Sequence, residues 1–338
     1  MKLQIALVLL LTAGCLVWVL WGIDLGVAVG SLDQVKWWLA LPMTAFYLFA
    51  HTLRTWRLRV LLDQPVSFGA LFSVNSVGYL AINVVPLRLG ELVRPYLLLE
   101  RHQVPFGTSM AAILVERLLD ILMLLLLLGW VSFFVDLPPT GIVVSNVDVV
   151  AAGQKLLAVV VSGGVVFIAL LLSIGGPLID LVVRLIPVPA IAERIGSFLH
   201  SFYQGLHGLV RQPRRGAAVL FHSVLVWVST VAAVACVLAA FPGIPHSIEA
   251  AATTWTITIT GMTVAPTPGF FGAYEAFCLA SLMLWDVSRE SGAALAVVMH
   301  LGQFGFTVVL GGAFLIVEGL SLRELVSASR RKAMDSTA

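Results

Sequence analysis

The class of this fold is decided by residues 109–135, which read SMAAILVERLLDILMLLLLLGWVSFFV. This stretch is longer than the roughly 20 apolar residues that cross a bilayer as a helix. Its charged residues are Glu116, Arg117 and Asp120, all in the first half. A charge near the centre of a membrane helix costs about 2.5–3.5 kcal/mol on insertion scales, so a charge retained there is a candidate for function. The stretch therefore predicts a membrane-spanning helix that carries functional charges.

The composition of the whole chain has the same character. Hydrophobic residues make up 59% of the 338 residues and charged residues only 11%. A soluble domain has about 25% charged residues, and a disordered chain is poor in apolar residues, so both classes are excluded. We predict an all-α polytopic membrane protein with six or more spans. The clean spans are expected near residues 3–22, 35–58, 109–135, 151–174, 216–241 and 292–317.

Two further apolar segments are interrupted by residues that break helices. Residues 67–99 contain Pro86 and Gly90, and residues 248–285 are broken at residues 266–269, which read PTPG. Each segment predicts a broken or re-entrant hairpin. The order span, span, broken hairpin, span then occurs twice, which predicts inverted-topology repeats of the kind that transporters use. A chance arrangement of apolar segments is the alternative.

These patterns predict one transmembrane domain over residues 1–320. Repeat A covers about residues 1–136 and repeat B about residues 150–320. Residues 175–215 hold five arginines between short apolar stretches and are expected to form an amphipathic cytoplasmic segment. Residues 321–338 are expected to form a cytoplasmic tail.

The distribution of Lys and Arg predicts that both termini lie in the cytoplasm, because these residues collect in cytoplasmic loops. With the amino terminus inside, fourteen of the twenty Lys and Arg residues fall on the inner side. Three fall outside, namely Lys36, Lys155 and Arg289. The last three lie in a hairpin or a span, namely Arg88, Arg94 and Arg117. We expect a multi-pass protein of a bacterial or archaeal cytoplasmic membrane.

The first interrupted segment carries the strongest candidates for anion binding. Arg88, Glu91 and Arg94 are spaced by three residues and share one stripe if this part is helical. A helix that begins after Pro86 would direct free N–H groups toward the tip of the hairpin, which suits an anion. Arginine adds a planar fork that matches phosphate oxygens. We expect Arg88 to be a principal contact to a phosphate; a structural network of ion pairs is the alternative.

Two other clusters of charge lie inside or next to predicted spans. Arg54 and Arg57 share a helix face, and they either anchor the helix at the cytoplasmic interface or hold an anionic headgroup. Glu116 and Asp120 are four residues apart, and Arg117 is three residues from Asp120. These acids are interpreted as a structural lock that receives the arginines, with a proton or cation relay as the alternative.

The second interrupted segment supplies a smaller polar group. Thr267, Tyr274 and Glu275 are its candidates for binding. A glutamate in an otherwise apolar helix needs a partner or a proton. His222 and His300 are isolated in apolar stretches and are interpreted as core histidines. Thr267, Tyr274 and Glu275 complete the predicted substrate site, together with the arginines and acids above. No metal ligand and no catalytic residue is expected in this site.

Four motifs in this order resemble a known family. They are RTWR at residues 54–57, NVVPLRLGELVR at residues 83–94, ERLLD at residues 116–120 and PGFFGAYE at residues 268–275. Together they resemble the flippase-like transmembrane domain of lysylphosphatidylglycerol synthases, over nearly the whole chain. The resemblance implies a domain that moves lipid between leaflets. The soluble aminoacyl-transfer domain of the bifunctional members is expected to be missing, since 18 residues follow Leu320.

The chain departs from the family pattern at two positions. The family usually has a second glycine where this chain has Phe270, and often an arginine where it has Tyr274. Both positions lie in the second interrupted segment, so they bear on which lipid headgroup is preferred.

The leading hypothesis is a transporter that moves an anionic or zwitterionic phospholipid, or a polyprenyl-phosphate-linked glycolipid, between leaflets. Arg88, Arg94 and Arg117 would hold the phosphate. No nucleotide-binding loop is present in the sequence, and no cofactor is expected. The alternatives are a membrane-embedded glycosyl or aminoacyl transferase and an accessory subunit of a lipid-pathway complex. The expected partner is a lipid with a phosphate-containing headgroup, with a second copy or a lipid-pathway enzyme as a further partner and no nucleic acid.

Overall fold

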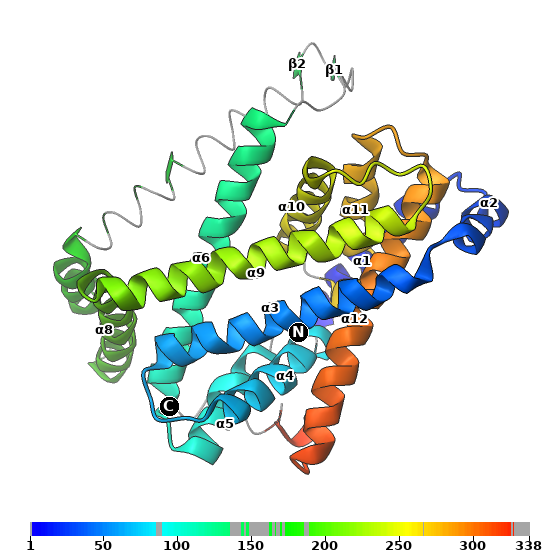
Figure 1. Cartoon of the computed structure of the whole chain (residues 1–338). Coiled ribbons are helices and arrows are strands. Elements are labelled where there is room, and N and C mark those ends of the chain that lie inside the picture. The colour runs from blue at the N-terminus through cyan, green and yellow to red at the C-terminus, as the bar shows by residue number, and fades with distance from the viewer. Residues whose placement is uncertain are drawn as a thin grey trace.

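The computed structural model is built almost entirely of helices (Figure 1). It describes residues 2–85, 90–135, 143–144, 147–148, 162–163, 166, 170, 173–185, 189–265, 267–325 and 327. The α-helices of the first half are α1 (Lys2–Leu20), α2 (Leu25–Gly30), α3 (Ala40–Leu62), α4 (Phe68–Val84), α5 (Val93–His102) and α6 (Phe106–Phe134). Those of the second half are α8 (Pro189–Arg211), α9 (Pro213–Ala240), α10 (Ile248–Val264), α11 (Ala273–Met283) and α12 (Arg289–Val317). Strands β1 (Val143–Val144) and β2 (Val147–Asp148) form one short antiparallel pair.

Several helices begin where the sequence supplies a cap. The side chains of Ser67, Ser247 and Ser288 each accept a hydrogen bond from the backbone N–H three residues further on, at 3.2–3.3 Å. Such caps satisfy N–H groups that have no partner inside the helix. They fix the starts of α4, α10 and α12.

Two of the described helices, α9 and α12, are long and apolar enough to cross a membrane by themselves. The residues Leu10–Leu20 and Leu25–Gln34 would give a third crossing, as one span bent by 82°. Helices α3 and α6 have 23 and 29 residues but carry buried charged side chains. The chain is therefore a helical protein with apolar spans, while a total of six or more spans stays a prediction. The expected span at residues 151–174 lies almost wholly outside the described residues.

Both interrupted segments consist of two shorter helices, as predicted. The first contains α4 and α5, and its central residues 86–89 lie outside the described part of the chain. The second contains α10 and α11, joined through the short 3-10 helix η4 (Pro268–Phe270). The expected amphipathic segment contains helical residues 173–184 and α8, which packs on α6 and α9.

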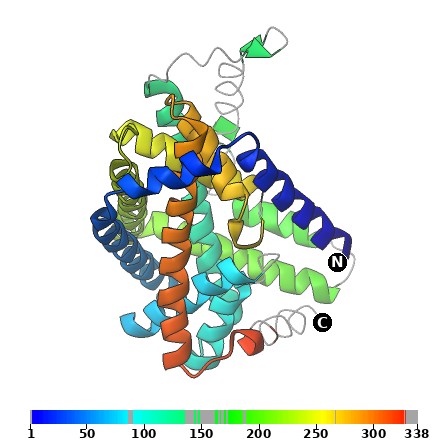
Figure 2. The same ribbon diagram turned by 90° about the vertical axis from the view of Figure 1, so that its right-hand side faces the viewer.

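Packing between the two halves is reciprocal. Helices α3 and α9 lie side by side and antiparallel, since Arg215 at the start of α9 donates to the carbonyl of Val60 near the end of α3, at 3.0 Å. Helix α4 packs on α12, and in the same way α10 packs on α6. Helices α6 and α12 run through the height of the molecule, with α4 and α5 below and α10 and α11 above in Figure 1; Figure 2 shows α12 from the side.

The apolar core has two main parts, one around each interrupted segment. The larger part joins residues of α9, α10, α11 and α12 with Met43 and Tyr47 of α3. The smaller part joins α4 and α5 with Leu58 and Leu62 at the end of α3. The described helices of each interrupted segment therefore pack against protein.

Candidate functional site

A buried set of ion pairs joins four helices. Arg57 of α3 donates from Nη1 to Asp120 Oδ1 of α6 at 2.7 Å and to Ser223 Oγ of α9 at 3.2 Å. Its Nε lies 3.6 Å from Glu116 Oε1. Arg94 of α5 donates from Nη2 to Glu116 Oε2 at 2.8 Å. The side chains of Arg57, Arg94 and Glu116 are 0–1% exposed, so each charge is balanced by its neighbours and not by water.

Three arginines contact Tyr79, two of them at the face of its ring and one at its hydroxyl. The guanidinium carbon of Arg54 lies 5.5 Å from the ring centroid, and that of Arg94 lies at the same distance. Arg117 donates to the Tyr79 hydroxyl at the long distance of 3.5 Å, and its nearest carboxylate contact is Asp120 Oδ2 at 3.7 Å. Arg54 forms no ion pair with any described carboxylate. Of the four arginines in this region, Arg54 has no described carboxylate partner and Arg117 has only the longer pair with Asp120.

Two adjoining cavities, of about 190 and 340 Å³, lie beside this cluster. Arg54, Arg117 and Asp120 belong to the walls of both. The two interrupted segments meet here, since α4 supplies Ile82 and the second segment supplies Phe270. The cavities therefore combine a positive side with apolar walls from both halves of the chain.

The first interrupted segment contributes Glu91 and Arg94 to this region. Arg88 lies outside the described residues. Glu91 lies in a short 3-10 turn before α5, so Glu91 and Arg94 do not continue one α-helical stripe. Arg94 pairs with Glu116 instead, while Glu91 lines the larger cavity. Four arginines (Arg54, Arg57, Arg94 and Arg117) and three acids (Glu91, Glu116 and Asp120) come together, which leaves a formal charge of +1.

The predicted residues of the second segment form a separate polar group. Glu275 Oε2 accepts a hydrogen bond from the backbone N–H of Gly272 at 2.7 Å. Its Oε1 lies 2.6 Å from Nδ1 of His300 on α12. Tyr274 stacks on His300 with ring centroids 4.3 Å apart and donates to Gln303 at 3.2 Å. The interpretation of His300 as an isolated core histidine was wrong, because it is the partner that Glu275 requires.

The tip of the second segment has an unusual backbone. Gly269 has a φ of +59°, and its carbonyl accepts from His300 Nε2 at 3.0 Å. Phe270 has a φ of +62°, a conformation that favours glycine. This is the position where the family resemblance predicts a glycine. The hydroxyl of Thr267 is buried and has no hydrogen-bond partner among the described residues.

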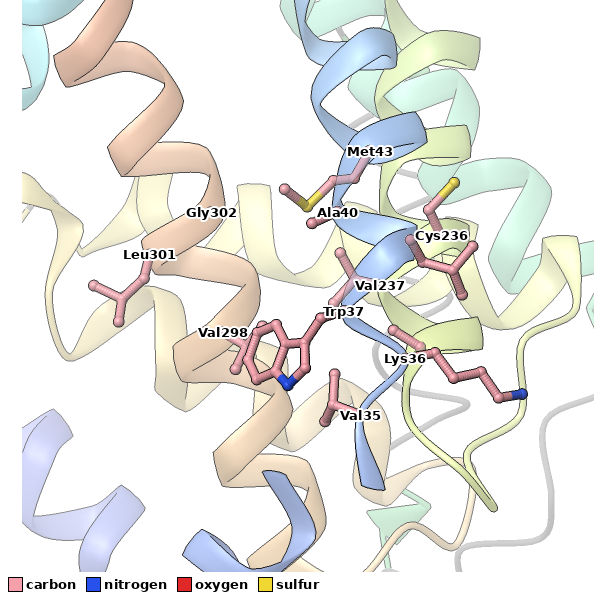
Figure 3. Close-up of a pocket in the computed structure, with 12 residues that line it drawn as sticks. Val35, Lys36, Trp37, Ala40, Met43, Cys236, Val237, Val298, Leu301 and Gly302 are labelled. Carbon is pink, nitrogen blue, oxygen red and sulfur yellow. The ribbon is translucent and has the colours of Figure 1, made fainter. Parts of the chain in front are cut away.

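A third cavity, of about 330 Å³, is apolar (Figure 3). Its walls come from α3, α9 and α12, and they include Met43, Cys236 and Val298. Lys36 lies at one end and extends away from α12 in Figure 3. The groove is suited to a hydrocarbon chain and offers no cluster of charges for a headgroup.

The close approach of α4 and Arg94 gives a testable requirement for glycine. A Cβ atom at Gly78 would overlap the Cγ and Cδ atoms of Arg94, which its ion pair holds in place. We expect Gly78→Ala to lower the melting temperature of the purified protein in detergent, since overpacking costs about 1–3 kcal/mol. Gly69 lies on the same helix with open space around it, so Gly69→Ala is the matched control. Equal melting temperatures for the two variants would contradict the observed packing.

Fold and site together define a helical membrane protein with a charged internal cavity between two interrupted segments. Comparison with known families gives the same class: the model of the lysylphosphatidylglycerol synthase transmembrane region matches residues 4–311. The chain belongs to this family.

Among individual proteins, the chain is 26% identical over 282 residues to a protein of Haloferax volcanii named Glycosyltransferase AglD. The match covers 77% of this chain and 45% of the relative, so the chain spans less than half of that protein's length. No solved structure matches the chain.

Proposed function

We propose that the protein moves a phosphate-containing lipid between membrane leaflets. The observation that carries the proposal is the pair of cavities in which Arg54 and Arg117 face space that both interrupted segments enclose. Arg57 and Arg94 are fully buried and paired with acids, so they hold the helices together. Arg54 forms no ion pair with a described carboxylate, and Arg117 has only its 3.7 Å pair with Asp120, so these two arginines are the ones that we propose to bind the phosphate.

The substrate class follows from the chemistry of the walls. A guanidinium binds phosphate oxygens through paired N–H donors. The acids Glu91 and Asp120 at the same cavities can contact an ammonium or hydroxyl group of a headgroup. We therefore propose an anionic or zwitterionic phospholipid or a polyprenyl-phosphate-linked glycolipid, with its chains in apolar surroundings.

The architecture that we propose is a pair of inverted repeats. It is supported by the reciprocal packing, in which α3 pairs with α9, α4 with α12, and α10 with α6. Transporters built in this way place the substrate between the broken helices near the midplane. The cytoplasmic position of both termini and the choice of membrane stay predictions, as do a second copy and a lipid-pathway enzyme as partners.

The test uses purified protein in vesicles of phosphatidylcholine and phosphatidylglycerol. A trace of fluorescent phosphatidylglycerol is included, and in a parallel sample a fluorescent polyprenyl phosphate. Dithionite bleaches only the outer leaflet, so a transporter raises the bleached fraction above one half. Vesicles without protein are the control. If neither probe crosses faster than in the control, the proposal fails for both classes of lipid.

A second candidate function is transfer of a sugar to a lipid. The favouring observation is the name of the Haloferax volcanii relative, a glycosyltransferase, which the chain matches over 45% of that protein's length. Incubation of the same vesicles with a radiolabelled sugar nucleotide and polyprenyl phosphate should then give a labelled lipid product. A product that depends on the protein would favour the transferase, and its absence together with leaflet transfer would favour the transporter.

A further inference from the structure

We propose that Glu275 and His300 form a binding site for one exchangeable proton, and that this proton couples to the shape of the charged cavities. The coupling to the cavities rests on the proposed transport function. The proton site itself follows from the geometry of the two side chains.

Hydrogen-bond directions at His300 require a proton between the two residues. Nε2 faces the carbonyl oxygen of Gly269, which can only accept, so Nε2 carries a hydrogen. Nδ1 lies 2.6 Å from Glu275 Oε1. A bare Nδ1 lone pair opposite a carboxylate oxygen at this distance would be repulsive. One proton therefore lies between them, bound to either atom.

Among the described residues, neither Glu275 nor His300 forms an ion pair with any other side chain. The side chains of Glu275 and His300 are 6% and 3% exposed. The titratable neighbours are Tyr274 and Cys278 on α11, Cys15 on α1 and Tyr47 on α3. Helix α4 carries no charged residue, and α10 carries only Glu249 in its first turn. Among the described residues, His300 is therefore the side chain that can share a proton with Glu275.

Two contacts connect this site to the cavities. His300 holds the carbonyl of Gly269, and the next residue, Phe270, is a wall of both cavities. Tyr274 stacks on His300 and donates to Gln303, which lines the smaller cavity. Loss of the shared proton makes Nδ1 of His300 and Oε1 of Glu275 repel each other. The repulsion weakens the contact between His300 and the carbonyl of Gly269. Proton binding and substrate binding then influence each other through one coupling free energy.

The proposed step binds and releases one proton. Binding forms one N–H bond at Nδ1 or one O–H bond at Oε1, and release breaks that bond. The proton is exchanged with water that reaches the pair when the tip moves. No other reactant takes part.

The direct test is infrared difference spectroscopy of the protein in phosphatidylcholine membranes, from about pH 5 to about pH 8. We expect a carboxyl or imidazole signal that is lost in both Glu275→Gln and His300→Gln. Glutamine at position 275 can donate to Nδ1 and still accept from Gly272, so the fold is kept without the proton. His222→Gln is the matched control, because His222 contacts a carbonyl of its own helix at 2.6 Å and should leave the signal unchanged. An identical spectrum for wild type and Glu275→Gln would show that the pair is a permanent structural lock.

The coupling is tested separately with fluorescent phosphatidylglycerol. The leaflet-transfer rate of the wild type should change by roughly fivefold or more across the same pH range, and that of Glu275→Gln should not. If the infrared signal is present but the leaflet-transfer rate of the wild type does not change with pH, the coupling is overturned and the proton site is kept. If the wild type moves no lipid at all, the proposed function fails, and infrared spectroscopy still decides the proton site.

Discussion

Replacing Glu116 with alanine is expected to destabilise the protein more than any other single substitution in the charged cluster. Glu116 contacts both fully buried arginines, at 2.8 Å from Arg94 Nη2 and 3.6 Å from Arg57 Nε. Its removal leaves Arg94 without an anionic partner in an apolar interior. Removing one member of a buried pair costs roughly 3–5 kcal/mol, because the charge left behind is neither hydrated nor paired. A large fall in the melting temperature in detergent, with loss of yield, is the expected measurement.

An exposed ion pair of the same chain provides the control. Arg101 and Glu318 are 2.7 Å apart, but their side chains are 40% and 29% exposed. Such pairs contribute about 0–1 kcal/mol, so Arg101→Ala should change the melting temperature little and leaves Glu318 its hydrogen bond from Ser73. The double variant Arg94→Met with Glu116→Met should be milder than Glu116→Ala, since both partners are removed. Equal effects of Glu116→Ala and Arg101→Ala would show that the buried pairs do not stabilise the fold.

The helical class and the two interruptions could be predicted because they depend on local composition. A run of apolar residues needs a helix in lipid whatever lies beside it. Proline and glycine clusters end helices by their own backbone chemistry, so the breaks near residues 86–90 and 266–269 could be placed from sequence. The predicted first span coincides with α1, and the bend of 82° lies beyond it, between α1 and the helical turns at residues 25–34.

The partners inside the site could be predicted only in part. Arg54 and Arg57 are three residues apart, which puts their side chains about 60° apart on a helix. The orientation of α3 against α6 and α9 decides that Arg57 is buried and Arg54 lines the cavities. That orientation depends on tertiary packing, which no local spacing encodes.

The pairing of Glu275 with His300 was missed for a related reason. The two residues are 25 positions apart on different helices, so no helical period connects them. A usable signal was present nonetheless. A lone glutamate in an apolar helix requires a polar partner, and the next helix carries one histidine in an otherwise apolar stretch. The two isolated groups together predict a pair that neither predicts alone.

The largest expected effect on activity comes from Arg54. We expect Arg54→Ala to lower leaflet transfer of fluorescent phosphatidylglycerol by about 10- to 150-fold, because a hydrogen bond to a charged group contributes roughly 1.5–3 kcal/mol. The fold should survive, since Arg54 contacts the face of Tyr79 and forms no ion pair with a described carboxylate. Arg54→Lys should recover part of the rate, because lysine keeps the charge and loses the planar fork.

Arg59 on the same helix is the matched control for Arg54. It is exposed and lies over the ring of Trp56 at 5.2 Å, away from both cavities. Arg59→Ala should therefore transfer lipid at the wild-type rate. Arg57→Ala should instead lose stability, because it removes the 2.7 Å partner of Asp120 and one of the two arginine partners of Glu116. A wild-type rate in a stable Arg54→Ala protein would mean that Arg54 does not hold the phosphate. Arg117 of α6 would then be the remaining described arginine that lines both cavities.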